Sequence, residues 1–166
     1  MSLELGWPDI PVTVIREGPY GIGTMQLYID SDPRITYFDM REHLKEKLFK
    51  LAVFDLLTNN ADRKASHCIL DDKDTIWSID HGLTFHSDFK LRTVMLEYCN
   101  VVINEELLKD LRLLRHNLTS KRVNNLLSPL ISEEEITSLG YRLDHMLNDP
   151  KLPILDPYQN VPWPLA

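Results

Sequence analysis

A short hairpin in the middle of the chain constrains the fold more than any other feature of this 166-residue sequence. Two β-rich runs, 68–70 and 75–79, flank the turn-forming run 71–74, which reads Asp-Asp-Lys-Asp. In an unbulged hairpin centred on that turn, the numbers of paired residues sum to about 145. This pairing places Asp80 roughly opposite Ala65 and next to His67.

The hairpin therefore brings two polar segments together. The segment before it contains Asp62, Arg63, Lys64 and His67, and the segment after it contains Asp80. Charges gathered in so small a volume need compensation, and a divalent metal or a phosphate-bearing ligand is the usual one. A loop aspartate beside a basic side chain can accept a proton from an attacking hydroxyl, and an aspartate at a strand end can hold a metal. By spacing alone, two solvated loop acids fit about equally well.

Strand patterns also predict a hairpin near the N-terminus. Residues 12–16 are β-rich, residues 24–29 alternate between apolar and polar types, and glycines at 18, 21 and 23 lie between them. The same glycines resemble a nucleotide-binding loop. No lysine follows them on a strand, so a plain hairpin turn is favoured by about three to one.

Leucines at helical spacing predict three helices. The first covers 40–57 and begins at a capping box formed by Asp39 and Glu42. The second follows Asn104, and the third follows a capping box that starts at Ser132. Two hairpins and these helices indicate an α+β fold with most of the helix in the second half.

Composition limits the partners and the compartment. The net charge of −7 argues against broad contact with nucleic acid or anionic lipid. No apolar run approaches the ~20 residues of a membrane span, and the N-terminus shows no export signal. Two cysteines, Cys68 and Cys99, fit a reducing cytoplasm. The proline-rich tail 148–166 is expected to lie irregularly along the surface, with Trp7 and Trp163 fixing the two ends to the body.

The polar segments also resemble a known family. Two motifs carry the resemblance: Asp-Arg-Lys-x-x-His, which begins at Asp62, and Ile-Asp-His-Gly, whose Asp80 lies 18 residues after Asp62. They resemble the catalytic loop and the metal motif of the protein-kinase-like superfamily. The nearest branch is phosphatidylinositol 3- and 4-kinase-like, which, like the HipA-type toxin kinases, has Asp-Arg-His-x-x-Asn and Ile-Asp-Phe-Gly. The run 54–92 is most similar to short bacterial proteins called phosphatidylinositol-kinase-like, and the resemblance extends from residue 6 to about 145.

The resemblance implies an ATP-dependent phosphotransferase that uses Mg²⁺ or Mn²⁺. Asp62 matches the catalytic aspartate, Lys64 would offset charge on the transferred group, and His67 and Asp80 match the metal ligands. The acceptor is expected to be a hydroxyl on a protein or a small molecule, because the acidic chain shows no polybasic face for lipid.

The resemblance also implies a division of the chain. Residues 1–35 would be a hinge-side hairpin, 36–147 the large lobe with its functional loops at 59–86, and 148–166 the tail. Within the hairpin strand, the backbone of the run Met25, Gln26, Leu27 and Tyr28 would hold the adenine.

Three departures from the family pattern suggest alternatives. His67 replaces an asparagine, and imidazole suits Mn²⁺ better than Mg²⁺. His81 replaces a phenylalanine, and the first lysine is Lys45, after the position where kinases hold the α- and β-phosphates. The chain alone is therefore expected to be inactive, and a pseudokinase or a nucleotide- or partner-binding module is the alternative. A zinc protein using Cys68 and nearby histidines (His67, His81 and His86) is a third hypothesis, at about one in ten.

Overall fold

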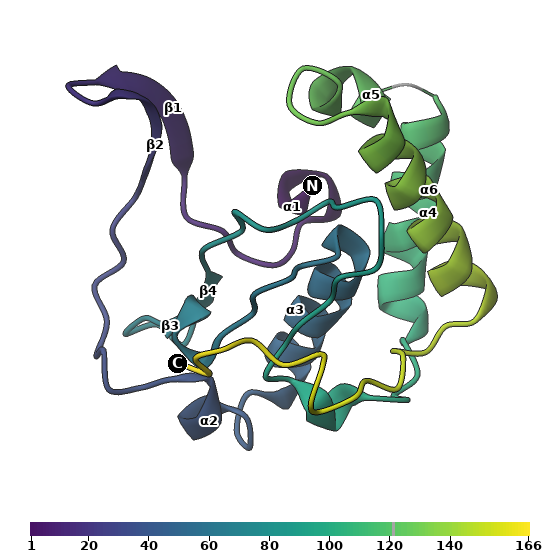
Figure 1. Ribbon diagram of the computed structural model, residues 1–166. Helices are drawn as coiled ribbons and strands as arrows, with labels where there is room; N and C mark the ends of the chain where they lie inside the picture. The colour runs from purple at the N-terminus through teal and green to yellow at the C-terminus, as the bar shows by residue number, and fades with distance from the viewer. Residues whose placement is uncertain (121) are drawn as a thin grey trace.

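The structure is a computed structural model that describes residues 1–120 and 122–166. Over these residues it has six α-helices and two separate antiparallel hairpins, which confirms the α+β class (Figure 1). The elements are α1 (Ser2–Leu5), β1 (Thr13–Gly18), β2 (Gly21–Gln26), α2 (Tyr37–Met40), α3 (Lys45–Thr58), β3 (Cys68–Leu70), β4 (Ile76–Ser78), α4 (Glu105–Thr119), α5 (Arg122–Leu127) and α6 (Glu133–Asn148), with short 3₁₀ turns at Ala65–His67 and Leu96–Tyr98.

The N-terminal hairpin is confirmed, but its second strand lies earlier than the predicted 24–29. β1 and β2 pair from Thr13 with Gln26 to Gly18 with Gly21. Gly21 has a φ of 107°, which lets the chain reverse after only two intervening residues, so pairing starts at once. Every residue of both strands is exposed, and the hairpin stands away from the rest of the molecule in Figure 1.

The helix predicted over 40–57 is wrong at its start. The chain forms the short α2, then a turn, and begins α3 only at Lys45. Thr36 caps α2, and its backbone N–H donates to Asp39 Oδ2 at 2.9 Å, so Asp39 is the third residue of a short helix. Glu42 pairs instead with Lys45 at 3.0 Å. Two capping patterns overlap in this stretch, and local sequence does not choose between them.

α3 is the centre of the core. Nine of its residues are buried, and it ends at Asn59, whose φ of 54° turns the chain out of the helix. α6 packs against both α3 and α4. The predicted caps are confirmed: Asn104 accepts a hydrogen bond from Leu107 N at 3.0 Å, and Ser132 forms a capping box with Glu135. These helices position the loops on either side of the second hairpin.

The tail after α6 contains no helix or paired strand and runs back across the body to end beside β3 and α2 (Figure 1). The N–H of Ala65 donates to the carbonyl of Leu165 at 2.8 Å, which fixes the tail beside the predicted catalytic loop. Trp7 is buried, and its Nε1–H donates to Asp110 Oδ2 at 2.8 Å. This contact holds the N-terminal end to the body, as predicted. Trp163 is 88% exposed, so the expectation that it fixes the C-terminal end is wrong.

Across the two described stretches, none of the helices has the length and apolar character that crossing a bilayer requires.

Candidate metal centre

The second hairpin positions the two polar segments as the sequence predicts, within one residue. Cys68 pairs with Ser78 and Leu70 with Ile76, and beyond the strands the N–H of Ile79 donates to the carbonyl of His67 at 3.1 Å. The residues that follow β4 therefore lie beside those that precede β3. This pairing is what brings Asp80 to the first polar segment.

Three of the predicted residues meet in one cluster. Asp62, His67 and Asp80 each offer one ligand atom, and these atoms lie within 4.8 Å of one another. Nε2 of His67 is 3.4 Å from Oδ2 of Asp80, whose side chain is 60% exposed while that of His67 is 10% exposed. The cluster therefore opens to solvent on the Asp80 side and is closed on the His67 side.

The contact between His67 and Asp80 calls for a cation. Nδ1 of His67 lies 3.0 Å from the carbonyl oxygen of Asp62, which can only accept, so the ring proton is assigned to Nδ1. Burial lowers the pKa of His67. The charge of Asp80 acts to raise this pKa and the charge of Arg63 to lower it, and the net shift is downward, so the ring is neutral at pH 7. The bare Nε2 lone pair then faces a carboxylate oxygen. Two acceptors at 3.4 Å repel unless a positive charge lies between them, and either a ring proton or a bound cation would supply it.

Lys64 occupies the position expected of a charge-compensating residue. Its Nζ lies 3.2 Å from Oδ2 of Asp62, and both side chains are mostly buried. The two predicted catalytic residues, Asp62 and Lys64, therefore touch each other beside the cluster. The lysine cation thus offsets the negative charge of the Asp62 carboxylate.

A buried ion pair that the sequence reading missed holds the two loops together. Arg63 and Asp55 are 0% and 1% exposed, and the guanidinium donates from Nε to Oδ2 at 2.7 Å and from Nη2 to Oδ1 at 2.9 Å. Its Nη1 also donates to the carbonyls of His67 and Ile79, at 3.2 and 3.1 Å. Burial acts to lower the pKa of Arg63, but the charge and hydrogen bonds of Asp55 outweigh that effect and raise it. One side chain thus fixes the residues on both sides of the cluster.

His81 packs against the core and bonds to its neighbours. Its ring packs edge-on against Phe54 with centroids 6.0 Å apart, as an aromatic ring in this position would. Its Nε2 accepts from Arg63 at 3.2 Å and lies 2.9 Å from the hydroxyl of Ser78. Burial, with the nearby Arg63, lowers the pKa of His81 to about 4, so the ring is neutral.

The remaining candidates for a zinc site are engaged elsewhere. Cys68 is buried, and burial raises the pKa of its thiol to about 12, which leaves it protonated. Nδ1 of His86 accepts the N–H of Asp88 at 3.0 Å. Within the described ranges, the cluster of Asp62, His67 and Asp80 is the group of metal-ligating side chains that converges.

Two cavities share Gln26 at the end of β2, and Asp80 of the cluster lines the first of them. One, of about 550 Å³, is lined by Asp80, Gly82 and Gln26 among others, and the second, of about 460 Å³, is lined by Gln26, Leu27, Tyr28, Cys68, Ile69 and Ile79. Three of the four residues expected against an adenine therefore line the second cavity. Met25 does not line either cavity; its Sδ lies 3.2 Å from Nη1 of Arg16.

Comparison with curated proteins finds Protein Rv2133c of Mycobacterium tuberculosis (strain ATCC 25618 / H37Rv), which is 31% identical over an alignment of 199 residues. The match covers 99% of this chain and 71% of the relative. Because the alignment is longer than the 166 residues of this chain, the relative carries insertions within the matched region. No family model matches the chain, and no solved structure matches it.

Proposed function

We propose a phosphotransferase function for this chain, which belongs to the family of Protein Rv2133c of Mycobacterium tuberculosis. In the proposed reaction, a hydroxyl group attacks the terminal phosphoryl group of ATP at the cluster of Asp62, His67 and Asp80. A new P–O bond to the acceptor forms, the bond from the γ-phosphorus to the bridging oxygen breaks, and ADP leaves. The fold would be the large lobe of a phosphatidylinositol 3- and 4-kinase-like protein. The observation that carries the proposal is the convergence of these three side chains within 4.8 Å, with Asp80 also lining a cavity.

Each residue has a chemical role in this proposal. Asp62 orients the acceptor hydroxyl and takes its proton, while Lys64 offsets charge on the transferred phosphoryl group. His67 and Asp80 would hold a divalent metal, which would supply positive charge to neutralise the phosphates. The neutral ring of His67, with Nε2 aimed at Asp80, suits this role. One imidazole among carboxylates favours Mn²⁺ over Mg²⁺, which prefers oxygen ligands.

The cavities suggest where the rest of the nucleotide lies. Leu27, Cys68, Ile69 and Ile79 provide apolar contacts of the kind that an adenine ring needs, and the backbone of Gln26 to Tyr28 provides the polar edge. Asp80 lines the neighbouring cavity, which supports a pose with the phosphates toward the cluster. The acceptor is a hydroxyl on a protein or a small molecule, since the chain carries a net charge of −7 and is unsuited to an anionic membrane.

One observation favours the alternative of a pseudokinase or nucleotide-binding module. Among the described residues that line the two cavities, none is a lysine or an arginine. The α- and β-phosphates would then lack the lysine that an active kinase supplies, and Lys64 is already paired with Asp62.

Calorimetry with ATP and either Mn²⁺ or Mg²⁺ tests the proposal, together with a phosphate-release assay. We expect metal-dependent ATP binding that Asp80→Asn weakens about tenfold or more, because a metal ligand is lost. Asp72→Asn, in the exposed turn of the same hairpin, is the matched control and leaves binding unchanged. Asp62→Asn retains binding and loses turnover. Absence of ATP binding overturns the proposal. Because the chain alone is expected to be inactive, phosphate release is measured on the intact gene product, where binding without any phosphoryl transfer identifies the pseudokinase.

A further inference from the structure

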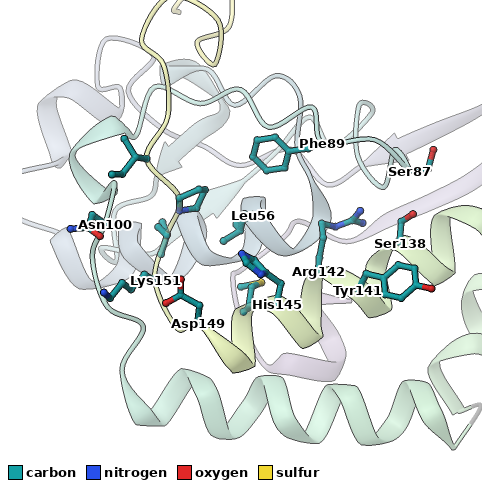
Figure 2. Close-up of a pocket in the computed structure, with 14 residues that line it drawn as sticks. Leu56, Ser87, Phe89, Asn100, Ser138, Tyr141, Arg142, His145, Asp149 and Lys151 are labelled. Carbon is teal, nitrogen blue, oxygen red and sulfur yellow. The ribbon is translucent and has the colours of Figure 1, made fainter.

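A separate cavity, of about 540 Å³, lies between α6, the end of α3 and the tail (Figure 2). Ser138, Arg142 and His145 line it from α6, at spacings of four and three residues, so they form one face of the helix, and Asp149, the C-cap, lines it just beyond. Figure 2 shows Arg142 and His145 on the side of α6 that faces Phe89. The volume falls within the range of about 300–1,000 Å³ that is typical of small-molecule sites.

Arg142 is a half-buried cation with no acidic partner. Its Nε donates to the carbonyl of Leu57 at 2.9 Å and its Nη1 to the carbonyl of His86 at 3.2 Å, while Nη2 is buried and has no hydrogen-bond partner. Among residues 1–120 and 122–166, no carboxylate lies within ion-pair distance of it. Arg63 and Arg115, by contrast, each pair with an aspartate. Burial lowers the pKa of Arg142 to about 10, which reflects the cost of this uncompensated charge.

The charge around Arg142 is also positive. Lys151 lines the same cavity, against one carboxylate, Asp149, so that two cations face one anion there. Lys151 is exposed and within the described chain makes no ion pair. The cavity is thus a cationic site in a chain whose net charge is −7. An anion entering it would meet attraction that is strengthened by the partial burial of Arg142.

The opposite wall is apolar. Leu56, Phe89, Pro153 and Ile154 line it, and Phe89 and Ile154 are 53% and 81% exposed although both are large apolar residues. Apolar side chains left open beside a cationic group form the pattern of a site for an amphiphilic ligand. A fully hydrated inorganic ion would leave this wall unused.

We propose that this cavity binds a small organic anion, whose carboxylate or phosphate pairs with Arg142 and Lys151 and whose apolar body packs against Phe89. The ligand is distinct from the nucleotide proposed for the metal centre, because the lining residues of this cavity and of the cluster do not overlap. The test therefore stands whether or not the chain transfers phosphate.

Amide chemical shifts of the ¹⁵N-labelled protein can be followed with four probes: 3-phenylpropionate, phenyl phosphate, the uncharged 3-phenylpropanamide, and inorganic phosphate. The two aromatic anions should shift the amides of 138–149 and of Phe89 and saturate at millimolar concentration. 3-Phenylpropanamide lacks the negative charge and inorganic phosphate lacks the apolar ring, so each should bind about tenfold more weakly. The stronger of the two aromatic anions identifies the preferred acidic group.

Two variants tie the binding to the named cations. Lys151→Met should weaken binding of the aromatic anion several-fold. Lys73 is an exposed lysine in the turn before β4, so Lys73→Met is the control and should leave binding unchanged. Arg142→Met should abolish binding, and its amide spectrum shows whether the fold is kept despite the loss of two carbonyl contacts. Equal binding of 3-phenylpropionate and its amide, shifts that map elsewhere, or no binding at about 10 mM overturns the proposal.

Discussion

The ion pair between Arg63 and Asp55 provides the sharpest test of how this site is built. We consider Asp55→Asn, which keeps the shape of the side chain and removes its charge. The guanidinium would remain 0% exposed, still donating to the carbonyls of His67 and Ile79, but without the carboxylate that accepts from two of its nitrogens.

The expected loss is large. Removing one partner of a buried ion pair costs about 3–5 kcal/mol, because the other charge is left without compensation. Domains of this size are stable by about 5–15 kcal/mol, so the variant should fold with much of its stability gone. At about 2 kcal/mol per molar urea, the unfolding midpoint should fall by about 1.5–2.5 M.

Urea unfolding followed by circular dichroism measures this change. The matched control is Asp32→Asn, because Asp32 and Arg34 form a forked pair of the same type at the surface, where Arg34 is 88% exposed. That variant should unfold at the wild-type midpoint. Replacing both buried residues, with Asp55→Leu and Arg63→Met, should recover about half of the loss, because no unpaired charge remains.

Two results would refute this reasoning. One is an Asp55→Asn midpoint that matches that of Asp32→Asn. The other is a double variant that loses as much as the two single variants combined, since this would show that the residues act independently. A weaker Mn²⁺ affinity in Asp55→Asn is also expected, because Arg63 holds the carbonyls beside His67 and Asp80.

Three further predictions concern single contacts. His81 has a folded-state pKa of about 4 against 6.5 when unfolded, so its stabilising effect is complete above pH 6.5 and falls by up to about 3 kcal/mol as the pH drops toward 4. In His81→Gln, the unfolding free energy should change less between pH 4 and pH 6.5 than it does in the wild type. If the two proteins have the same pH profile, His81 is not the group that titrates. Asn104→Ala should cost about 1 kcal/mol by removing the cap on α4, while Asn104→Asp should cost little; equal losses would argue against capping. Trp7→Phe should cost about 1 kcal/mol in thermal or urea unfolding through the lost bond to Asp110, with the exposed Trp163→Phe as a neutral control, and similar midpoints for the two would count against the contact.

Features set by local sequence were predictable. The caps at Asn104 and Ser132 depend on residues three positions apart, and the second hairpin depends on one turn, so each was found close to its observed place. That hairpin then sufficed to bring Asp62, His67 and Asp80 together. The start of α3 was missed because two capping patterns compete in the residues before it.

Features set by tertiary packing were not predicted. Asp55 lies seven residues after Leu48 and four after Leu51, on the face of α3 that the leucines mark as buried, and a carboxylate at such a position indicates a buried partner. Its pairing with Arg63 could have been suspected from that signal. Nothing local indicates that Trp7 would be buried while Trp163 would not, because both lie in proline-containing segments and their fates depend on the surface beneath them.

The isolated N-terminal hairpin has a consequence for how tightly ligands bind. A two-stranded hairpin with both faces exposed is only marginally stable, and a fraction of molecules will have β1 and β2 unpaired at any moment. Gln26, the last residue of β2, lines both cavities proposed for the nucleotide. A ligand that needs Gln26 in place has an apparent dissociation constant equal to the intrinsic one divided by the paired fraction. Any partner that pairs with a free edge of this hairpin raises that fraction, and so tightens binding in the cavities without contacting the ligand.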